Sequence, residues 1–176
     1  MSAPFAMPST LESERLRLVP WHQRHFEDVY RFNADQEATR FVGGVMTRAE
    51  ASRAFMTVPG HWALRGYGIY AVERKDGTFV GGCGLYYPHG WPELELGYDQ
   101  LPEHQGHGYI TEAARAVIDE AGRRGLTRLV SLIHPENARS IRVAERLGAV
   151  KERTFDLLQP GNPVVCYRHQ LRGAAA

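Results

Sequence analysis

Two glycines, Gly106 and Gly108, separate a strand-like run at residues 93–101 from a helix-like run at residues 111–122. The chain must turn here from a strand into a helix, and the first N–H groups of a helix have no partner within it. Glycine leaves the backbone open to close approach by a ligand because it has no side chain. Together with the positive end of the helix dipole, these free donors predict an anion site at the turn.

The residues around the glycine turn narrow the kind of anion site. Gln105 and His107 add side-chain donors at its rim. No Gly-Lys-Ser/Thr sequence is present, which argues against a P-loop, and the Gly-x-Gly-x-x-Gly pattern fails because position 111 is threonine. An ordinary strand-to-helix turn, in which glycine gives only steric ease, remains the alternative on these residues alone.

Hydrophobic periodicity and turn signals divide the rest of the chain into strands and helices. A capping box at residues 47–50 starts one helix, which Pro59 and Gly60 are expected to interrupt, with its continuation through residues 61–64 after a kink as the alternative. Asp76-Gly77 lies between two strand-like runs and predicts a β-hairpin. The expected strands are 16–20, 67–74, 79–87, 93–101, 129–133, 150–158 and 164–171, and the expected helices are 26–33, 47–58, 111–122 and 137–147.

This order, β-α-α-β-β-β-α-β-α-β-β, predicts an α/β (α+β) domain on a mixed, mostly antiparallel central sheet flanked by helices. The chain has 176 residues, enough for one such domain with a full core. We expect a flexible N-terminal tail at residues 1–10, a single domain at 11–172 and a C-terminal tail at 173–176.

Composition and charge argue against several classes of protein. The net charge is +1 and no basic stripe is present, so nucleic-acid binding has little electrostatic support. Residues 1–10 lack the basic start and apolar core of a signal peptide, and no apolar run approaches the ~20 residues of a membrane span. We therefore expect a cytoplasmic protein without nucleic-acid or membrane partners.

Cysteine and histidine positions give little support for a disulfide or a metal site. Cys83 and Cys166 are far apart in apolar runs, which predicts buried free thiols. His104 and His107 are close enough in the sequence to be read as a pair of metal ligands, but no third ligand lies near them. No metal is expected.

The run from Leu101 to Ala113 resembles the pyrophosphate loop of the Gcn5-related N-acetyltransferase (GNAT) family, whose pattern is Arg/Gln-x-x-Gly-x-Gly/Ala. The match is Gln105, Gly108 and Ile110, so isoleucine replaces the last small residue of the pattern. The Thr-Glu-Ala-Ala that follows is similar to the branch that includes the ribosomal-protein N-terminal acetyltransferases. Further landmarks occur in the family's order: Gly84-Leu85, residues 95–98 (Glu-Leu-Gly-Tyr), Asn137 and Leu147-Gly148.

The resemblance implies an N-acetyltransferase that uses acetyl-CoA as co-substrate. In the family, backbone groups left free where two central strands splay apart bind pantetheine, which here involves the stretch around Leu101. The residues that the resemblance places at the cofactor are Leu101, Gln105, Gly106, His107, Gly108, Tyr109, Ile110, Thr111 and Asn137. For Asn137, a simple helix N-cap is the alternative.

The implied chemistry needs a group that takes a proton from the incoming amine, because only a nitrogen with a lone pair attacks a thioester. Glu95 matches the acid that the family often places on this strand; alternatively, Glu93 and Glu95 share a solvated strand face. Many relatives carry a tyrosine as general acid seven residues after the asparagine, but this position is Ala144. Ser140 matches a serine of the ribosomal-protein branch and is the candidate donor to the leaving thiolate, with ordinary capping as the alternative.

The acceptor site is expected opposite the cofactor, between the first two helices, the 88–92 loop and the 159–163 turn. Candidate acceptor residues are Phe41, Tyr86, Tyr87 and Trp91, although aromatics at such places are often core. No acidic cluster marks a polyamine or aminoglycoside site. The partner is therefore an amine of unidentified type (a protein N-terminus, an amino acid or a small amine), and a homodimer is left open. The alternatives are a non-catalytic acyl-CoA-binding domain and an unrelated nucleotide-binding α/β domain.

Overall fold

The computed structural model describes residues 5–171. Residues 1–4 of the expected N-terminal tail, residue 172 of the expected domain and the whole expected C-terminal tail, residues 173–176, lie outside the described residues. The strands are β1 (Leu11–Glu12), β2 (Leu16–Val19), β3 (Ile69–Arg74), β4 (Phe79–Tyr86), β5 (Glu95–Gln100), β6 (Val130–Ile133), β7 (Val150–Asp156) and β8 (Pro163–Arg168). The helices are α1 (Phe26–Asn33), α2 (Gln36–Thr39), α3 (Arg48–Arg65), α4 (Tyr109–Arg123) and α5 (Ala138–Arg146), with short 3₁₀ turns at Gln23–His25 and Pro102–His104.

The eight strands form one sheet in the order β1-β2-β3-β4-β5-β6-β8-β7. Every neighbouring pair is antiparallel except β5 and β6, which are parallel. The predicted mixed, mostly antiparallel sheet is therefore confirmed. The two-residue strand β1 and the single-turn helix α2 were not expected, because both are too short for a periodic pattern to reveal.

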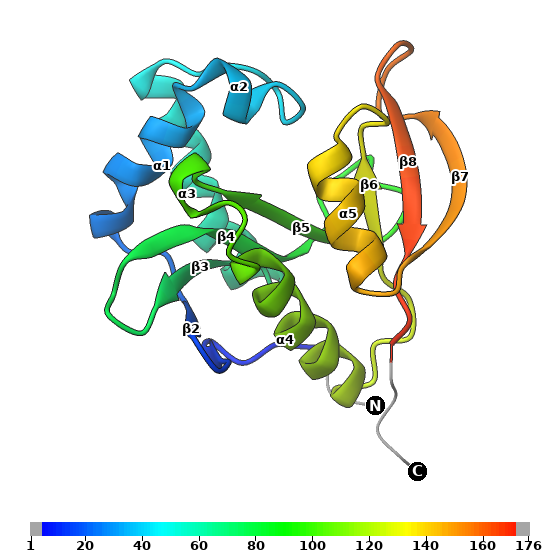
Figure 1. Cartoon of the computed structure of the whole chain (residues 1–176), viewed down its shortest axis with the longest axis horizontal. Coiled ribbons are helices and arrows are strands. Elements are labelled where there is room, and N and C mark those ends of the chain that lie inside the picture. Colours follow the sequence, from blue (N-terminus) through cyan, green and yellow to red (C-terminus); the bar gives the residue numbers. More distant parts are fainter. Residues whose placement is uncertain (1–4, 172–176) are drawn as a thin grey trace.

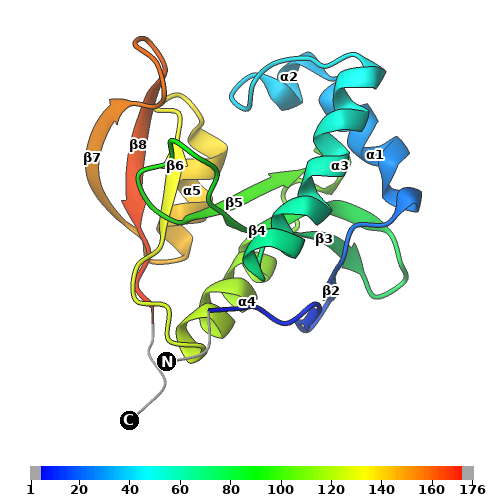
Figure 2. The ribbon, with the colours of Figure 1, turned by 180° about the vertical axis from the view of Figure 1, so that it is seen from behind.

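Helices cover both faces of the sheet. Helix α4 packs on the β2–β5 half and α5 on the β6–β8 half, both on the side that faces the viewer in Figure 1. Helices α1 and α3 lie on the opposite face, which Figure 2 brings to the front. The main core lies under α4, where Val117 and Ala114 pack on Leu85 and Leu96 with no more than 1% of any of these residues exposed.

The parallel strands β5 and β6 stay together for only one residue pair. Their single Cα partnership is Glu95 with Val130, whereas β4 and β5 pair over six residues. Beyond Glu95 the two strands diverge, as the crossing directions of β5 and β6 in Figure 1 show. This splay divides the sheet into two halves and leaves one side of β5 without a neighbouring strand.

The glycines of β4 allow two backbones to come close. A Cβ on Gly81 would lie 2.3 Å from the carbonyl oxygen of Asp99, and one on Gly84 would lie 2.2 Å from that of Gly68. Any side chain at either position would force the strands apart. The glycines of residues 81–84 are therefore required by the close approach of neighbouring backbones.

Two features of the N-terminal half differ from the simplest expectation. Helix α3 is not interrupted at Pro59 and Gly60 and continues to Arg65, through the residues 61–64 that the alternative added to it. Both residues are exposed, so the missing N–H of proline lies on the solvent side, where water can satisfy the freed carbonyl. Residues 5–8 of the expected tail pack on the domain, because Met7 is buried and donates its N–H to the carbonyl of Gly66 at 2.9 Å.

Candidate active site

The glycine turn forms an uncapped helix N-terminus. Gly108 is the N-cap residue of α4 with φ 75°, Gly106 has φ 82°, and no side chain caps the helix. The N–H groups of Tyr109, Ile110 and Thr111 therefore have no partner within the helix. A Cβ on Gly106 would meet nothing within 4 Å, so the turn is open to solvent. The local geometry is that of an anion site.

Arg15 brings a positive charge to this turn. Its Nη1 donates to the carbonyl of His107 at 3.0 Å and its Nε to Glu112 Oε2 at 2.7 Å. Its guanidinium also lies 4.8 Å from the centre of the Tyr109 ring. No local sequence pattern indicates this contact, because 92 residues separate Arg15 from His107.

The side chains at the rim of the turn make contacts within the chain. The His107 ring stacks on Tyr109 with centroids 5.5 Å apart, and its Nδ1 lies 3.2 Å from the carbonyl of His104. Gln105 Oε1 accepts a hydrogen bond from Arg139 Nη1 at 2.5 Å. This bond orients the amide of Gln105, and it brings a second arginine close to the turn.

The free edge of β5 lies beside this turn. Leu101 donates its N–H to Val80 at 2.9 Å and its carbonyl accepts from His104 at 3.1 Å, so both of its backbone groups are occupied. Because pairing alternates along an antiparallel strand, Tyr98 and Gln100 direct their backbone groups away from β4, into the splay. These two residues, rather than Leu101, carry the backbone groups that face the splay.

Glu95 lies at the apex of the splay. Its Oε1 accepts the N–H of Leu132 on β6 at 3.1 Å, in place of a further sheet bond, and its Oε2 accepts Trp91 Nε1–H at 2.5 Å. Burial raises the pKa of this carboxyl to about 7, and the two hydrogen bonds only partly oppose the shift. Near neutral pH, Glu95 therefore exists both as an acid and as a base.

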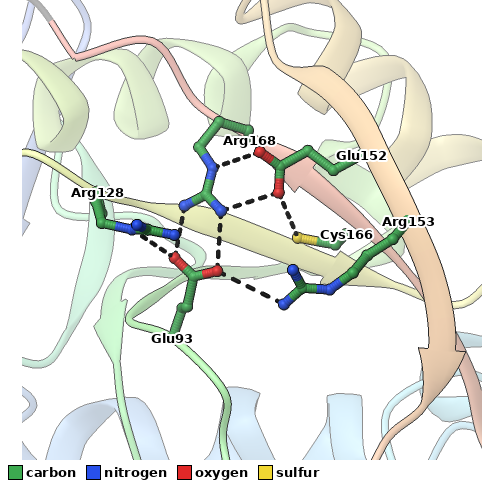
Figure 3. A network of polar contacts seen from close by, with 6 residues as sticks. All are labelled: Glu93, Arg128, Glu152, Arg153, Cys166 and Arg168. Carbon is green, nitrogen blue, oxygen red and sulfur yellow. Dashed lines mark hydrogen bonds and ion pairs between the residues drawn. The ribbon is translucent and has the colours of Figure 1, made fainter.

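Glu93, two residues earlier, is part of an ion-pair network and lies apart from the cavities described below. Both of its carboxylate oxygens accept from Arg168, at 2.7 and 2.9 Å, and Arg128 donates to it at 3.1 Å (Figure 3). Hydrogen bonds from Arg168 lower the pKa of Glu93 to about 2. The network ties the segment before β5 to β8 and, through Glu152, to β7.

Two cavities meet beside β5. A small one of about 110 Å³ is lined by Gln105, Ile110, Asn137 and Ser140, next to the glycine turn. A larger one of about 760 Å³ lies on the α1–α3 face and is lined by Glu95 together with Phe41, Tyr86 and Trp91. The residues that line both cavities are Phe32, Phe41, Val42, Tyr98 and Asp99. The fold thus gathers most of the expected cofactor and acceptor residues around one strand.

Comparison with known proteins identifies this arrangement. Residues 15–150, well over half of the chain, match the family model described as Acetyltransferase (GNAT) domain. The chain belongs to the GNAT acetyltransferase family. It is therefore an acyltransferase, as its sequence landmarks implied.

Individual relatives of this acetyltransferase agree with that assignment. A solved acetyltransferase from Agrobacterium tumefaciens is 30% identical, with a TM-score of 0.84 over 97% of this chain and 98% of that one. The uncharacterized protein YkkB of Bacillus subtilis is 36% identical over 52% of this chain and 56% of its own length. RimL, a ribosomal L7/L12 alpha-N-protein acetyltransferase solved with coenzyme A, shares the fold at 17% identity, with a TM-score of 0.78 over 94% of this chain and 99% of its own.

The start of α5 in this acetyltransferase borders the small cavity. Asn137 is the N-cap, and its Oδ1 accepts the N–H of Ser140 at 3.2 Å. Tyr98 Oη donates to the carbonyl of Ser140 at 2.9 Å, which ties α5 to β5 across the splay. Asn137 thus caps the helix and also lines the cavity, so its two expected roles are compatible.

Tyr87 lies outside both cavities, unlike the other acceptor candidates. Its N–H donates to His61 Nε2 at 3.2 Å, and the guanidinium of Arg65 lies 5.4 Å from the centre of its ring. Tyr86 is the last residue of β4 and lines the larger cavity, whereas Tyr87 follows the end of the strand.

Asp99 was missed at the sequence level although it lines both cavities of the acetyltransferase. Its Oδ1 accepts the N–H of Gly82 at 2.8 Å, and burial raises the pKa of its carboxyl to about 6. The signal was present, since Asp99 lies four residues after Glu95 and so shares its strand face. Trp21 and Phe32 also line the larger cavity, and only the tertiary structure reveals them.

Two further observations on the described residues concern a metal site and a membrane-spanning helix. Within residues 5–171, no three His, Cys, Asp or Glu side chains lie close enough together to hold a metal ion. Over the same part of the chain, no helix is both long and apolar enough to cross a membrane. Cys83 and Cys166 are both buried and unpaired.

Proposed function

We propose that this acetyltransferase moves the acetyl group of acetyl-CoA to a primary amine by direct attack in a ternary complex. The observation that carries the proposal is the position of Glu95. Its carboxylate lies where β5 and β6 part, between the free edge of β5 and the larger cavity. A base at this point can reach an amine that enters from the cavity.

The free edge of β5 and the glycine turn fit coenzyme A. The open N–H groups of Tyr109, Ile110 and Thr111, together with Arg15, suit a pyrophosphate. The backbone groups of Tyr98 and Gln100 suit the amides of pantetheine, which would pair with β5 as an added strand. The coenzyme A complex of RimL, a protein of the same fold, supports this assignment. When bound, acetyl-CoA supplies an activated acyl thioester.

Glu95 is proposed to prepare the amine for attack. A free α-amino group has a pKa near 8 and a lysine side chain near 10.4, so an amine arrives largely protonated at neutral pH. The carboxylate of Glu95, with its pKa raised to about 7 by burial, is a suitable acceptor for that proton. Backbone N–H groups on the splay side of β5 would stabilise the negative charge that develops on the thioester oxygen.

Ser140 is the proposed donor to the leaving thiolate. It lines the small cavity, next to Asn137 and across from Gln105. Ala144 offers no acid at the position where many relatives carry tyrosine. Ser140→Ala should therefore slow turnover without changing the affinity for acetyl-CoA.

The test measures thiol release from acetyl-CoA across a panel of amino acids, small amines and peptides with free N-termini. We expect release with at least one acceptor class, and a large loss of rate in Glu95→Gln. Calorimetry with acetyl-CoA is run in parallel. Tight cofactor binding without thiol release for any amine would overturn the proposal in favour of a non-catalytic acyl-CoA-binding domain.

A further inference from the structure

The floor of the larger cavity is one face of β5. Residues alternate between the two faces of a strand, so Glu95, Gly97 and Asp99 share this face, and all three line the cavity. The Cα atoms of Glu95 and Asp99 are separated by four residues of strand, about 13 Å. Because Gly97 has no side chain, the cavity stays open between Glu95 and Asp99. A Cβ at this position would lie 3.3 Å from Ile69 Cδ1.

The two carboxylates on this floor have no cationic partner in the described chain. No lysine or arginine lines the cavity, and neither Glu95 nor Asp99 forms an ion pair with any residue between 5 and 171. Glu95 accepts two hydrogen bonds, whereas Asp99 accepts one, from Gly82. Carboxylates withdrawn from water without a counter-charge are costly, and a bound cation removes that cost.

The walls around Asp99 are aromatic. A Cβ placed on Gly82 would lie 3.0 Å from Asp99 Oδ2 and 3.3 Å from Trp21 Cζ2, so the carboxylate and the indole lie side by side. The Nε1–H of Trp21 is occupied by the carbonyl of Ile69 at 2.9 Å, so the indole offers the cavity its ring rather than a donor. An aromatic ring next to a carboxylate is a favourable environment for an ammonium group.

We infer that Asp99 binds a second cationic group of the acceptor, and that the acceptor is a small aliphatic diamine lying along β5 across Gly97. This inference rests on the proposed function, because it places the reacting nitrogen of the same molecule at Glu95. Burial raises the pKa of Asp99 to about 6, and an ammonium group bound beside this carboxylate would offset the cost of burying its charge. A volume of about 760 Å³ falls within the range of small-molecule pockets.

The sequence already contains the four-residue spacing that places Glu95 and Asp99 on one face of a strand. It does not reveal the aromatic walls around Asp99, because these come from distant segments of the chain. Strand geometry places both carboxylates on one cavity floor. The diamine specificity is therefore a property of β5 and its neighbours.

The experiment compares straight-chain α,ω-diamines of increasing length with the monoamines of the same length, using the full chain and acetyl-CoA. We expect a lower KM for diamines, and Asp99→Asn should raise that KM by about 10- to 100-fold while leaving the monoamine KM within about twofold. Asn keeps an oxygen for the N–H of Gly82. Asp119→Asn makes the same chemical change at an exposed residue of α4 and serves as the matched control.

A second variant and a binding measurement keep the test decisive. Gly97→Ala adds a methyl group to the floor and should weaken diamines more than short monoamines. Diamine binding is also measured by calorimetry in the presence of coenzyme A, where turnover plays no part. Equal use of diamines and monoamines would overturn the inference, and so would a diamine preference that survives both Asp99→Asn and Gly97→Ala. In either case, acetylation of monoamines would still support the proposed function. Diamine binding that depends on Asp99 without any acetylation would instead reject the proposed function, and with it the role of the diamine as acceptor, and would leave Asp99 as a cation-binding residue only.

Discussion

Glu95 Oε1 accepts the backbone N–H of Leu132 at 3.1 Å, and this bond stands where β5 and β6 would otherwise continue their ladder. The side chain of Glu95 thus takes the place of a backbone hydrogen bond where the pairing of β5 and β6 ends, and the two strands diverge from this point. The carboxylate is held by two donors, but its burial keeps the pKa near 7. The same contact that ends the pairing of the strands therefore places a titratable group at the proposed reaction site.

Glu95→Gln should lower kcat by about 10²- to 10³-fold, because the amide accepts no proton from the amine. For the parent enzyme, kcat should rise with pH and level off above about 7, as Glu95 loses its proton. The kcat of the variant should not show this rise with pH, and its affinity for acetyl-CoA, measured by calorimetry, should match that of the parent. A pH–rate profile that is the same in both proteins would assign Glu95 a structural role only.

The same substitution should change how stability depends on pH. Burial raises the folded-state pKa of Glu95 above its unfolded value near 4.5, so the folded state binds a proton more readily. The stability from this group is complete below about pH 4.5 and is lost as pH rises through about 7. Urea midpoints at pH 5 and pH 8 should therefore differ less in Glu95→Gln than in the parent. An unaltered difference between the two midpoints would show that the carboxyl titrates near its ordinary value.

Gly108→Val should weaken acetyl-CoA binding by at least about tenfold, since a branched side chain would occupy the approach to the open N–H groups of α4. Gly125→Val is the matched control, because Gly125 follows the other end of α4 with φ 86° and therefore suffers similar backbone strain. Both variants should lose stability, but only Gly108→Val should lose affinity in calorimetry. Equal affinities of the two variants for acetyl-CoA would show that the cofactor does not bind at this turn.

Arg15→Gln should lower the affinity for acetyl-CoA by about three- to tenfold, because a guanidinium beside the turn attracts phosphate groups. The loss should shrink as salt is added, since salt screens exposed charges. Arg53→Gln, which removes an exposed arginine of α3 on the opposite face of the sheet, should leave affinity unchanged. A loss of the same size in both variants would point to overall charge and not to the position of Arg15.

Glu93→Gln should reduce the free energy of unfolding by about 2–4 kcal/mol at neutral pH, because it removes one of the two carboxylate partners of Arg168, and the Glu93–Arg168 pair is mostly buried. Only 16% of the Glu93 side chain is exposed. The pKa of about 2 means that the stabilisation is present above pH 4.5 and disappears as pH falls toward 2. In chemical denaturation, Glu12→Gln, which breaks an exposed pair with Lys75, should show no measurable change. Similar results for the two variants would mean that the network of Figure 3 adds nothing to an ordinary surface pair.

The amino-acid sequence by itself determined the order of the main elements, the hairpin at Asp76-Gly77 and the glycine turn before α4. These features depend on neighbours within a few residues, where periodicity, capping and turn preferences act directly. Only the tertiary structure decided the path of α3 through Pro59, the contact of Arg15 with the turn and the place of Asp99 beside Trp21. Those outcomes depend on which distant segments pack together, and on which side of a helix or strand meets solvent, so no local pattern encodes them.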